Sequence, residues 1–299
     1  MTMQDSYLPL ECTQLKIGSL CTGYGGLDLA VEAHFDATTV WCAEFDKYAS
    51  QVIEQRFNIP NHKDIKSIDW SSLEPIDILT AGYPCQPFSH AGYRKGTEDE
   101  RHLFPYILEA ISILRPRLVI LENVKGHLSL GLKEVLQGLA VTGYDARWQV
   151  VRASDVGAPH RRERVFILAQ PTNTDGVRLP LGQISGNEVW HQGQPQSEPS
   201  SMGATIIDTI SELKSPVEGV QRMGRKFTSR RDMHLQTPPT PLDQDDKLNA
   251  LFVEYMMGLP KGWVTDTGLS RAQQLKMLGN GVVPQQAEYA LEILTAVDN

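Results

Sequence analysis

The stretch LKIGSLCTGYGGLDLAVEAHF, residues 15–35, carries the pattern that decides the fold. Residues 15–20 form a short apolar run that predicts a buried strand. Glycines follow at positions 23, 25 and 26, and the residues after them have the spacing of an amphipathic helix. Glycine lets a backbone come close to a ligand, and a helix N-terminus offers free N–H groups. The pattern also fits an ordinary tight turn, and it departs from GxGxxG at the third glycine, which disfavours a dinucleotide oxidoreductase.

Similar apolar runs alternate with helix-like segments up to about residue 170. We expect strands at 37–45, 76–83, 117–124, 146–151 and 164–169, and helices at 46–57, 103–114 and 131–142. This alternation predicts an α/β fold, a doubly wound, mostly parallel sheet with helices on both faces. In such sheets, ligands bind at the carboxyl ends of the strands.

The composition changes near Pro171. From there to about residue 245 the chain is rich in Gly, Gln, Ser, Thr and Pro without a clear period, so we expect irregular structure. Regular patterning returns at 248–260. The segment 272–297 is expected to form a turn and a closing helix, with LGNGVVP (278–284) as a tight turn centred on Asn280.

Charge and cysteine content narrow the class of protein. The net charge of −8 argues mildly against a nucleic-acid partner. Two basic clusters, at 161–164 and 219–231, could still form a basic face, although each also fits a solvated surface. The four cysteines form no CxxC pair and have no histidine at zinc spacing, so we expect free thiols and no metal.

Targeting signals are not evident in the sequence. No apolar run approaches the roughly 18 residues of a membrane helix, and the N-terminus lacks the pattern of a signal peptide. We therefore expect a cytoplasmic protein without a membrane partner.

Three residues follow the glycine turn in strand order and favour an adenosyl ligand. Glu44 ends the second predicted strand, where a carboxylate can bind a ribose diol. Phe45 could stack on an adenine ring, and Asp64 could accept a hydrogen bond from its amino group. Singly, each acid is more often a cap or a surface residue.

The loop AGYPCQPFSHAG (81–92) is the strongest single signal. Cys85 lies between Pro84 and Gln86 in a polar, Gly- and Pro-rich loop after a predicted strand. Most cysteines are inert core residues, but this loop is a poor place for a core thiol. We therefore predict that Cys85 is reactive.

Two further motifs supply charged groups. Glu122 and Asn123 end the most apolar strand, in LVILENVKG (118–126), and Glu122 is expected near Cys85 because neighbouring strand ends converge. In GAPHRRERVFIL (157–168), Arg162 and Arg164 alternate at the start of a strand and are expected to point the same way.

In this order the motifs resemble the DNA (cytosine-5)-methyltransferase family, of bacterial or phage type. The resemblance covers roughly 15–170 and 250–292, and its diagnostic pieces are PCQPFS, ENV, the RxR pair and GNGVVP. It implies an S-adenosylmethionine-dependent methyltransferase fold with a smaller, irregular target-recognition domain. The expected division is 1–170 for catalysis and cofactor binding, 171–265 for target recognition, and 266–299 for a segment that returns to the catalytic domain.

The resemblance also implies a role for each motif. Cys85 would attack carbon 6 of cytosine, Glu122 would hold ring nitrogen 3 and the exocyclic amine, and Arg162 and Arg164 would anchor the base oxygen and Glu122. Gln86 to Arg101 resembles a mobile loop that closes over DNA. The implied S-adenosyl-L-methionine contacts are Ser19, Leu20, Gly23, Gly25, Gly26, Leu27, Glu44, Phe45, Asp64, Ile65, Asn280 and Val282. The implied DNA contacts are Gln86, Ser89, Asn123, Arg225 and Arg230.

Two stretches depart from the family pattern. The family usually has Asp-Leu-Phe where this chain has Ser19-Leu20-Cys21, so an acid and an aromatic of the cofactor site are missing. His160 stands where a glutamine is usual. These changes put cofactor affinity in doubt and leave the covalent chemistry intact.

The expected activity is methyl transfer to carbon 5 of cytosine in duplex DNA, by a monomeric enzyme of a restriction-modification system, of phage DNA protection or of regulation. A tRNA cytosine-5 methyltransferase is the alternative within enzymes. A catalytically inactive DNA-binding protein is the alternative outside them, although intact Cys85, Glu122, Arg162 and Arg164 argue against it.

Overall fold

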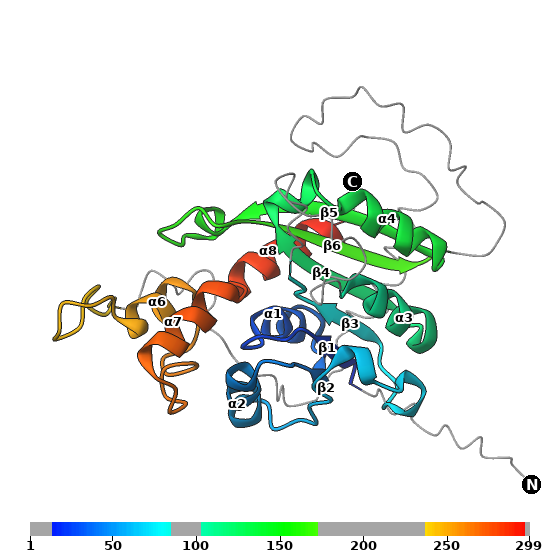
Figure 1. Cartoon of the computed structure of the whole chain (residues 1–299). Helices are drawn as coiled ribbons and strands as arrows, with labels where there is room; N and C mark the ends of the chain where they lie inside the picture. The colour runs from blue at the N-terminus through cyan, green and yellow to red at the C-terminus, as the bar shows by residue number, and fades with distance from the viewer. Residues whose placement is uncertain (1–13, 85–102, 173–236, 297–299) are drawn as a thin grey trace, which may run out of the picture.

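One mixed sheet organises the fold, which we describe from a computed structural model over residues 14–84, 103–172 and 237–296 (Figure 1). Its six strands lie in the order β2-β1-β3-β4-β6-β5. Strands β2, β1, β3 and β4 are parallel to one another, and β6 runs antiparallel to both β4 and β5. The prediction of a mostly parallel sheet is confirmed. The strands are β1 (Lys16–Leu20), β2 (Thr38–Ala43), β3 (Ile78–Ala81), β4 (Leu118–Val124), β5 (Tyr144–Arg152) and β6 (Glu163–Pro171).

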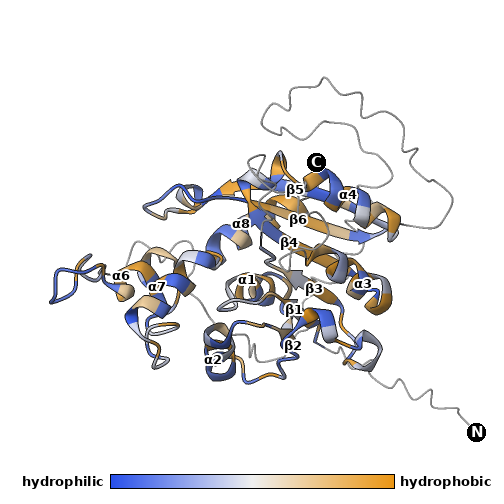
Figure 2. Ribbon diagram, in the orientation of Figure 1, coloured by the Kyte–Doolittle hydropathy of each residue, from blue (hydrophilic) through white to orange (hydrophobic). Residues whose placement is uncertain are grey.

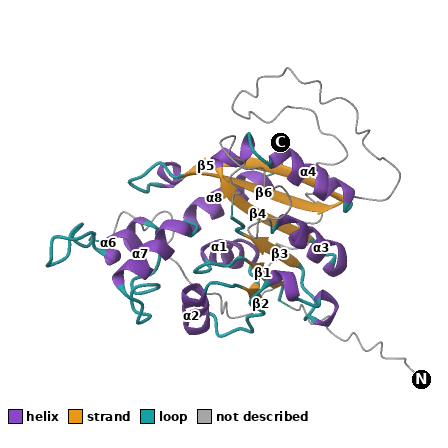
Figure 3. Cartoon of the chain, in the orientation of Figure 1, coloured by secondary structure: helices purple, strands orange, loops and turns teal. Residues whose placement is uncertain are grey.

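The central strands are apolar because helices cover both faces of the sheet. Every residue of β3, and all of β4 except Val124, is buried. The hydropathy colouring of Figure 2 shows β4 and β6 as mostly hydrophobic. Helices α1 (Gly26–Phe35) and α8 (Pro284–Thr295) pack on one face, and α3 (Phe104–Leu114) and α4 (Leu132–Val141) pack on the other (Figure 3). In a doubly wound sheet both faces of the central strands are covered by helices, so these strands consist almost entirely of apolar residues.

A third apolar cluster joins the C-terminal helices to the glycine turn. It involves α2 (Lys47–Arg56), α6 (Ala250–Met256) and α7 (Arg271–Asn280). The Trp263 indole packs against Phe57 and donates a 2.9 Å hydrogen bond to the Tyr24 carbonyl. Buried Glu254 accepts hydrogen bonds from the main chain of Gly262, Val264 and Thr265, which fixes the loop that carries this tryptophan.

The prediction of a turn and one helix for 272–297 is wrong, because two helices form there. Ser270 and Gln273 make a capping box that starts α7. Asn280 is therefore the last residue of a helix and not the centre of a tight turn. Pro284 then starts α8. Proline is favourable in the first turn of a helix, because the N–H group that it lacks would have no acceptor within the helix there.

Four short 3₁₀ turns complete the described structure: η1 (Ile65–Ser67), η2 (Trp70–Ser72), η3 (Lys125–Leu128) and η4 (Ala153–Val156). Most of the expected target-recognition segment, 171–265, lies outside the described residues. No helix within the described ranges is long and apolar enough to cross a membrane.

Candidate active site

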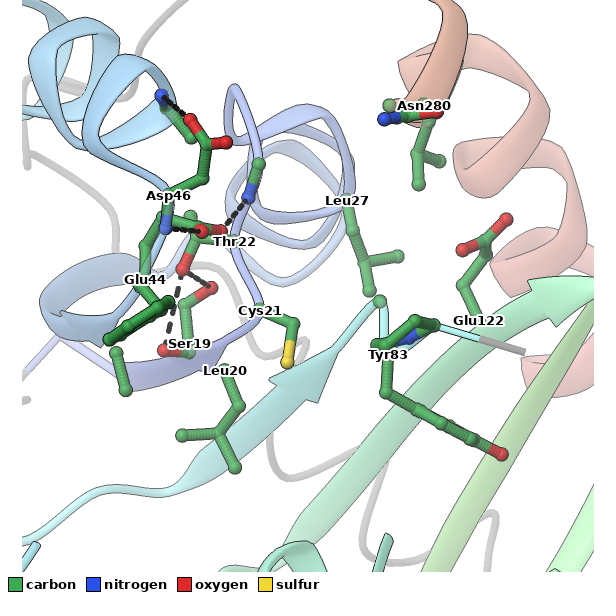
Figure 4. A pocket seen from close by; sticks show the side chains of 18 of the residues that line it. Ser19, Leu20, Cys21, Thr22, Leu27, Glu44, Asp46, Tyr83, Glu122 and Asn280 are labelled. Atoms are coloured by element: carbon green, nitrogen blue, oxygen red, sulfur yellow. Dashed lines mark hydrogen bonds between the residues drawn. The ribbon is translucent and has the colours of Figure 1, made fainter. Parts of the chain in front are cut away.

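A cavity of about 890 Å³ opens at the carboxyl ends of β1, β2, β3 and β4. This size falls in the range of small-molecule and cofactor sites. Figure 4 shows Ser19, Thr22 and Glu44 gathered on one side of the cavity, with Glu122 and Asn280 on the other and Leu27 between them. Of the cofactor contacts expected from the sequence, those that line the cavity are Ser19, Leu20, Gly23, Leu27, Glu44, Phe45, Asp64, Ile65, Asn280 and Val282.

The three glycines of the turn have different surroundings. Gly23 lines the cavity with a φ of +60°, and a Cβ at this position would meet nothing within 4 Å. A Cβ at Gly25 would collide with the Phe57 ring, and one at Gly26 would collide with the Val282 carbonyl. Neither Gly25 nor Gly26 lines the cavity, so the structure gives both a packing role.

The β2 side of the cavity carries a carboxylate fixed by the main chain. The Gly23 N–H donates to Glu44 Oε2 at 2.8 Å, and the Asp46 N–H donates to Oε1 at 2.8 Å. Burial raises the pKa of Glu44, and these hydrogen bonds oppose the increase. Phe45 is 76% exposed and lines the rim. Asp64 caps η1 by accepting from the Lys66 N–H at 3.0 Å.

The β4 side carries a carboxyl group of a different kind. Glu122 is 7% exposed, and its Oε1 lies 2.9 Å from Nε of Arg164. Burial raises the pKa of Glu122 to about 7, although the charges of Arg164 and Arg162 lower it. The adjacent Asn123 side chain donates to the carbonyl of Tyr83 at 3.1 Å and so fixes the chain just before Pro84.

The two arginines of the RxR pair have different hydrogen-bond partners, although the charges of both act on Glu122. Arg164 lies in β6 and reaches Glu122, whereas Arg162 precedes the strand with a φ of +34°. The Arg162 guanidinium donates to the carbonyls of Gly279 and Gly281, at 2.9 and 2.5 Å, and does not line the cavity. The strand begins one residue after Arg162, so Arg162 itself is not part of the alternating pattern.

The glycine turn and the segment after α7 are held against each other. The Tyr24 hydroxyl donates to the Val282 carbonyl at 2.6 Å. With the Arg162 bonds, this contact sets the position of Asn280 and Val282 on the cavity wall. His160, where the family usually has glutamine, lies 3.0 Å from the Met256 carbonyl. Its ring therefore contacts α6 instead of the cavity.

Several predicted site residues lie outside the described residues. They are Cys85, Gln86, Ser89, Arg225 and Arg230. Pro84, the residue before Cys85, is described and lines the cavity. Burial raises the pKa of both described cysteines, Cys21 and Cys42, to about 12, so each is a neutral thiol near pH 7.

The structure adds polar residues that the motifs did not indicate. Asp28 and Thr80 line the cavity, and their side chains are hydrogen-bonded to each other. Asp28 belongs to the apolar pattern of a helix, where an acid normally faces solvent. Its burial depends on Thr80 from a strand 52 residues away, and no local signal predicts that contact.

More than half of the chain matches a known protein family. The model of the family described as C-5 cytosine-specific DNA methylase covers residues 15–180. The chain belongs to this C-5 cytosine-specific DNA methylase family. The match spans the glycine turn, Glu44, Cys85, Glu122 and the RxR pair, and it includes all six strands of the sheet.

The chain is similar to several Type II methyltransferases from bacteria. The Type II methyltransferase M.Bsp6I of a Bacillus species is 40% identical over 162 residues, which are 52% of this chain and 51% of the relative. M.NgoBI of Neisseria gonorrhoeae is 40% identical over 185 residues, 58% of each chain. The matched part thus spans about half the length of these relatives. M.MspI of Moraxella is 25% identical over 91% of this chain and 68% of its own.

Solved structures share the fold. The DNMT2 variant of Spodoptera frugiperda gives a TM-score of 0.59 at 18% identity, and covers 95% of this chain and 100% of its own. The Schizosaccharomyces pombe Dnmt2 methyltransferase also gives 0.59 at 18% identity, over 94% and 98%. At this level of identity the likeness establishes the architecture alone.

Proposed function

We propose that this methylase transfers a methyl group from S-adenosylmethionine to carbon 5 of cytosine in duplex DNA. One observation carries the proposal: a single cavity contains both the Glu44–Phe45–Asp64 side and the Glu122–Arg164 pair. The first side suits an adenosyl group and the second suits a pyrimidine edge. Pro84 lines the same cavity, and Cys85 is the next residue in the chain. This supports a position for the Cys85 thiol at the cavity.

The cavity residues fit the cofactor. Glu44 retains lone pairs for a ribose diol while main-chain N–H groups hold its position. Phe45 presents an exposed ring for stacking, and Gly23 leaves the backbone open to the cavity. When bound, S-adenosylmethionine supplies an electrophilic methyl group on a sulfonium centre.

The chemistry needs a nucleophile because carbon 5 of cytosine is itself a poor one. The Cys85 thiolate adds to carbon 6, and the electron pair of the 5,6 double bond makes carbon 5 nucleophilic enough to take the methyl group. The cofactor would supply that methyl group and would leave as a thioether that keeps the electrons of the carbon–sulfur bond. A base then removes the proton from carbon 5, the double bond re-forms, and the thiolate leaves. We assign this base to a water molecule.

Glu122 acts on the opposite edge of the ring. Negative charge develops on nitrogen 3 as the thiolate adds, so a protonated carboxyl there can donate to that atom. With a pKa of about 7, Glu122 carries a proton in a large fraction of molecules near neutral pH. Arg164 holds Oε1 and leaves the second oxygen to face the base.

The target atom lies inside the base stack of a duplex, so the nucleotide must rotate out at a cost of a few kcal/mol. We propose that Gln86, Ser89, Asn123, Arg225 and Arg230 contact the DNA, and that 171–265 reads the target, with the part from α6 to Trp263 also packed against α2 and the glycine turn. We further propose that 1–170 and 266–299 together form the catalytic domain and that the enzyme acts as a monomer. Its expected location is the cytoplasm of a bacterial or phage-infected cell, where it would bind DNA at the nucleoid. The Type II names of the relatives support a place in restriction-modification.

The test compares two cysteine variants of the full chain. Cys85→Ala should abolish transfer of radiolabelled methyl from S-adenosylmethionine to duplex DNA and preserve cofactor binding. Cys12→Ala is the matched control because Cys12 precedes the family match, and it should retain activity. Retained methylation in Cys85→Ala, or transfer to tRNA and not to DNA, would overturn the proposal.

Duplex DNA with 5-fluorocytosine at the target provides a second test. Fluorine cannot leave carbon 5 as a proton does, so the enzyme should remain covalently attached to the DNA. Peptide mapping should find the adduct on Cys85. An adduct on any other residue would contradict the assignment.

A further inference from the structure

Asp28 is a buried carboxylate in the cavity to which the proposed chemistry gives no role. It lies in the first turn of α1, is 1% exposed, and lines the cavity beside Leu27. The Thr80 hydroxyl donates to its Oδ1 at 2.5 Å, and the Ser19 hydroxyl also hydrogen-bonds to it. Ser19 and Thr80 are themselves register partners on β1 and β3. Two strands and a helix therefore converge on this one carboxylate.

The other carboxylates of the cavity have donors of other kinds. Glu44, Asp46 and Asp64 accept from main-chain N–H groups, and Glu122 pairs with a guanidinium. Asp28 accepts from the hydroxyls of Thr80 and Ser19 and from its own main-chain N–H, and no cationic side chain in the described part of the chain forms an ion pair with it. A buried carboxylate of this kind requires either a proton or a cation.

The electrostatics of Asp28 agree with that requirement. Burial raises the pKa of Asp28, the hydroxyls of Thr80 and Ser19 lower it, and the neighbouring charge of Glu32 raises it; together these effects place the pKa at about 6. A cationic group that entered the cavity would stabilise the ionised form. Asp28 is thus suited to pair with a cationic group of a ligand.

Its position identifies which part of a ligand would meet it. The strand order β2-β1-β3-β4 puts Glu44 at the end of β2, Ser19 and Thr80 on the two middle strands, and Glu122 on β4. A ligand with its adenosine over β2 and its reactive methyl toward β4 must cross the middle strands. The sulfur that follows the ribose at this point carries the amino-acid moiety as well as the methyl group.

We propose that Asp28 binds the α-ammonium group of the amino-acid moiety of the cofactor. This inference rests on the proposed function, because it takes the cofactor to be S-adenosylmethionine. It also gives a reason for Ser19: the acid usual at that position is replaced by one from the helix, which reaches the same part of the cavity through the Ser19 hydroxyl.

The experiment is a calorimetric titration of the full chain with two ligands. S-adenosylhomocysteine carries the ammonium group, and 5′-methylthioadenosine retains the adenosine and the sulfur without it. Asp28→Asn should weaken the first ligand by at least about tenfold and the second by less than about twofold. Glu32→Gln is the matched control, because Glu32 is a buried carboxylate one turn further along α1 that does not line the cavity. Glu32 acts on Asp28 only through its charge, so Glu32→Gln should change neither affinity by more than about twofold.

The outcomes separate the inference from the proposed function. If Asp28→Asn weakens both ligands equally, or weakens neither, the inference is wrong while the proposed cofactor stands. If the unaltered chain binds neither ligand, both the inference and the proposed function are wrong. Should Asp28→Asn fail to fold, the double variant Ser19→Asp/Asp28→Ser keeps one carboxylate in the same place. It should bind S-adenosylhomocysteine within about threefold of the unaltered chain, and a roughly tenfold loss would overturn the inference.

Discussion

The two sides of the cavity each present a buried glutamate, and the partners of the two groups differ. At Glu44 both carboxylate oxygens accept main-chain N–H groups, from Gly23 and Asp46. At Glu122 only Oε1 is held, by Arg164, and Oε2 has no hydrogen-bond partner among the described residues. A carboxylate saturated by main-chain donors is a fixed acceptor, suited to holding a ligand's hydroxyls. One with a free oxygen and a raised pKa can carry a proton to a reacting ring.

The difference between the two glutamates predicts that the largest effect on activity follows substitution of Glu122. Glu122→Gln keeps the shape of the side chain and removes the transferable proton, so the single-turnover rate of methyl transfer should fall roughly hundred- to ten-thousandfold. Cofactor affinity, measured by calorimetry, should stay within about twofold, because the amide is remote from the adenosine side. Glu163→Gln, on the neighbouring strand and paired outward with Lys125, is the control and should retain the rate. Equal rate losses in the two variants would contradict the proposed role.

The second largest effect is expected at the Arg164–Glu122 pair. Arg164→Met retains much of the apolar volume and leaves a buried carboxyl without its partner, which should cost about 3 kcal/mol of unfolding free energy. Arg152→Met breaks the more exposed pair with Glu163 and should cost no more than about 1 kcal/mol. Urea unfolding of both variants measures the difference. Similar costs would show that the Glu122 side is no better shielded from solvent than the surface.

The pKa of Glu122 also makes stability depend on pH with a definite sign. The pKa is raised from an ordinary 4.5 to about 7, so the folded state holds the proton more tightly than the unfolded state. The stabilisation from this group is full below pH 4.5 and is lost as pH rises through 7, by up to roughly 3 kcal/mol. Glutamine cannot ionise, so the Tm of Glu122→Gln relative to the unaltered chain should rise between about pH 5 and pH 8. A constant difference would mean that Glu122 stays ionised.

The sequence predicted the sheet well because local pattern determines it. Apolar runs such as LVILENV are bounded by glycine, proline or polar residues, and each became a strand close to its expected limits. Glu44, Glu122 and Asn123 could be placed at strand ends for the same reason. Their approach to one cavity follows from parallel strands sharing one edge.

The failures came where a contact joins distant parts of the chain. The contact of Arg162 with the carbonyls of Gly279 and Gly281, more than a hundred residues away, could not be predicted from the RxR spacing. Gly25 and Gly26 were expected at the ligand, yet their surroundings are Phe57 and Val282. The role of Asp28 depends in the same way on Thr80. A one-dimensional pattern contains no information about these pairings.

The smallest predicted effect tests the adenosine side alone. Phe45 is 76% exposed, so Phe45→Ala should leave the unfolding free energy within about 0.5 kcal/mol. The loss of stacking should still weaken S-adenosylhomocysteine about three- to tenfold, since an aromatic contact contributes roughly 1 kcal/mol. Phe45→Tyr retains the ring and should bind as the unaltered chain does. Because the ring lies on the opposite side of the cavity from Glu122, the transfer rate at saturating cofactor should not change, and a reduced rate would show that the two sides are coupled.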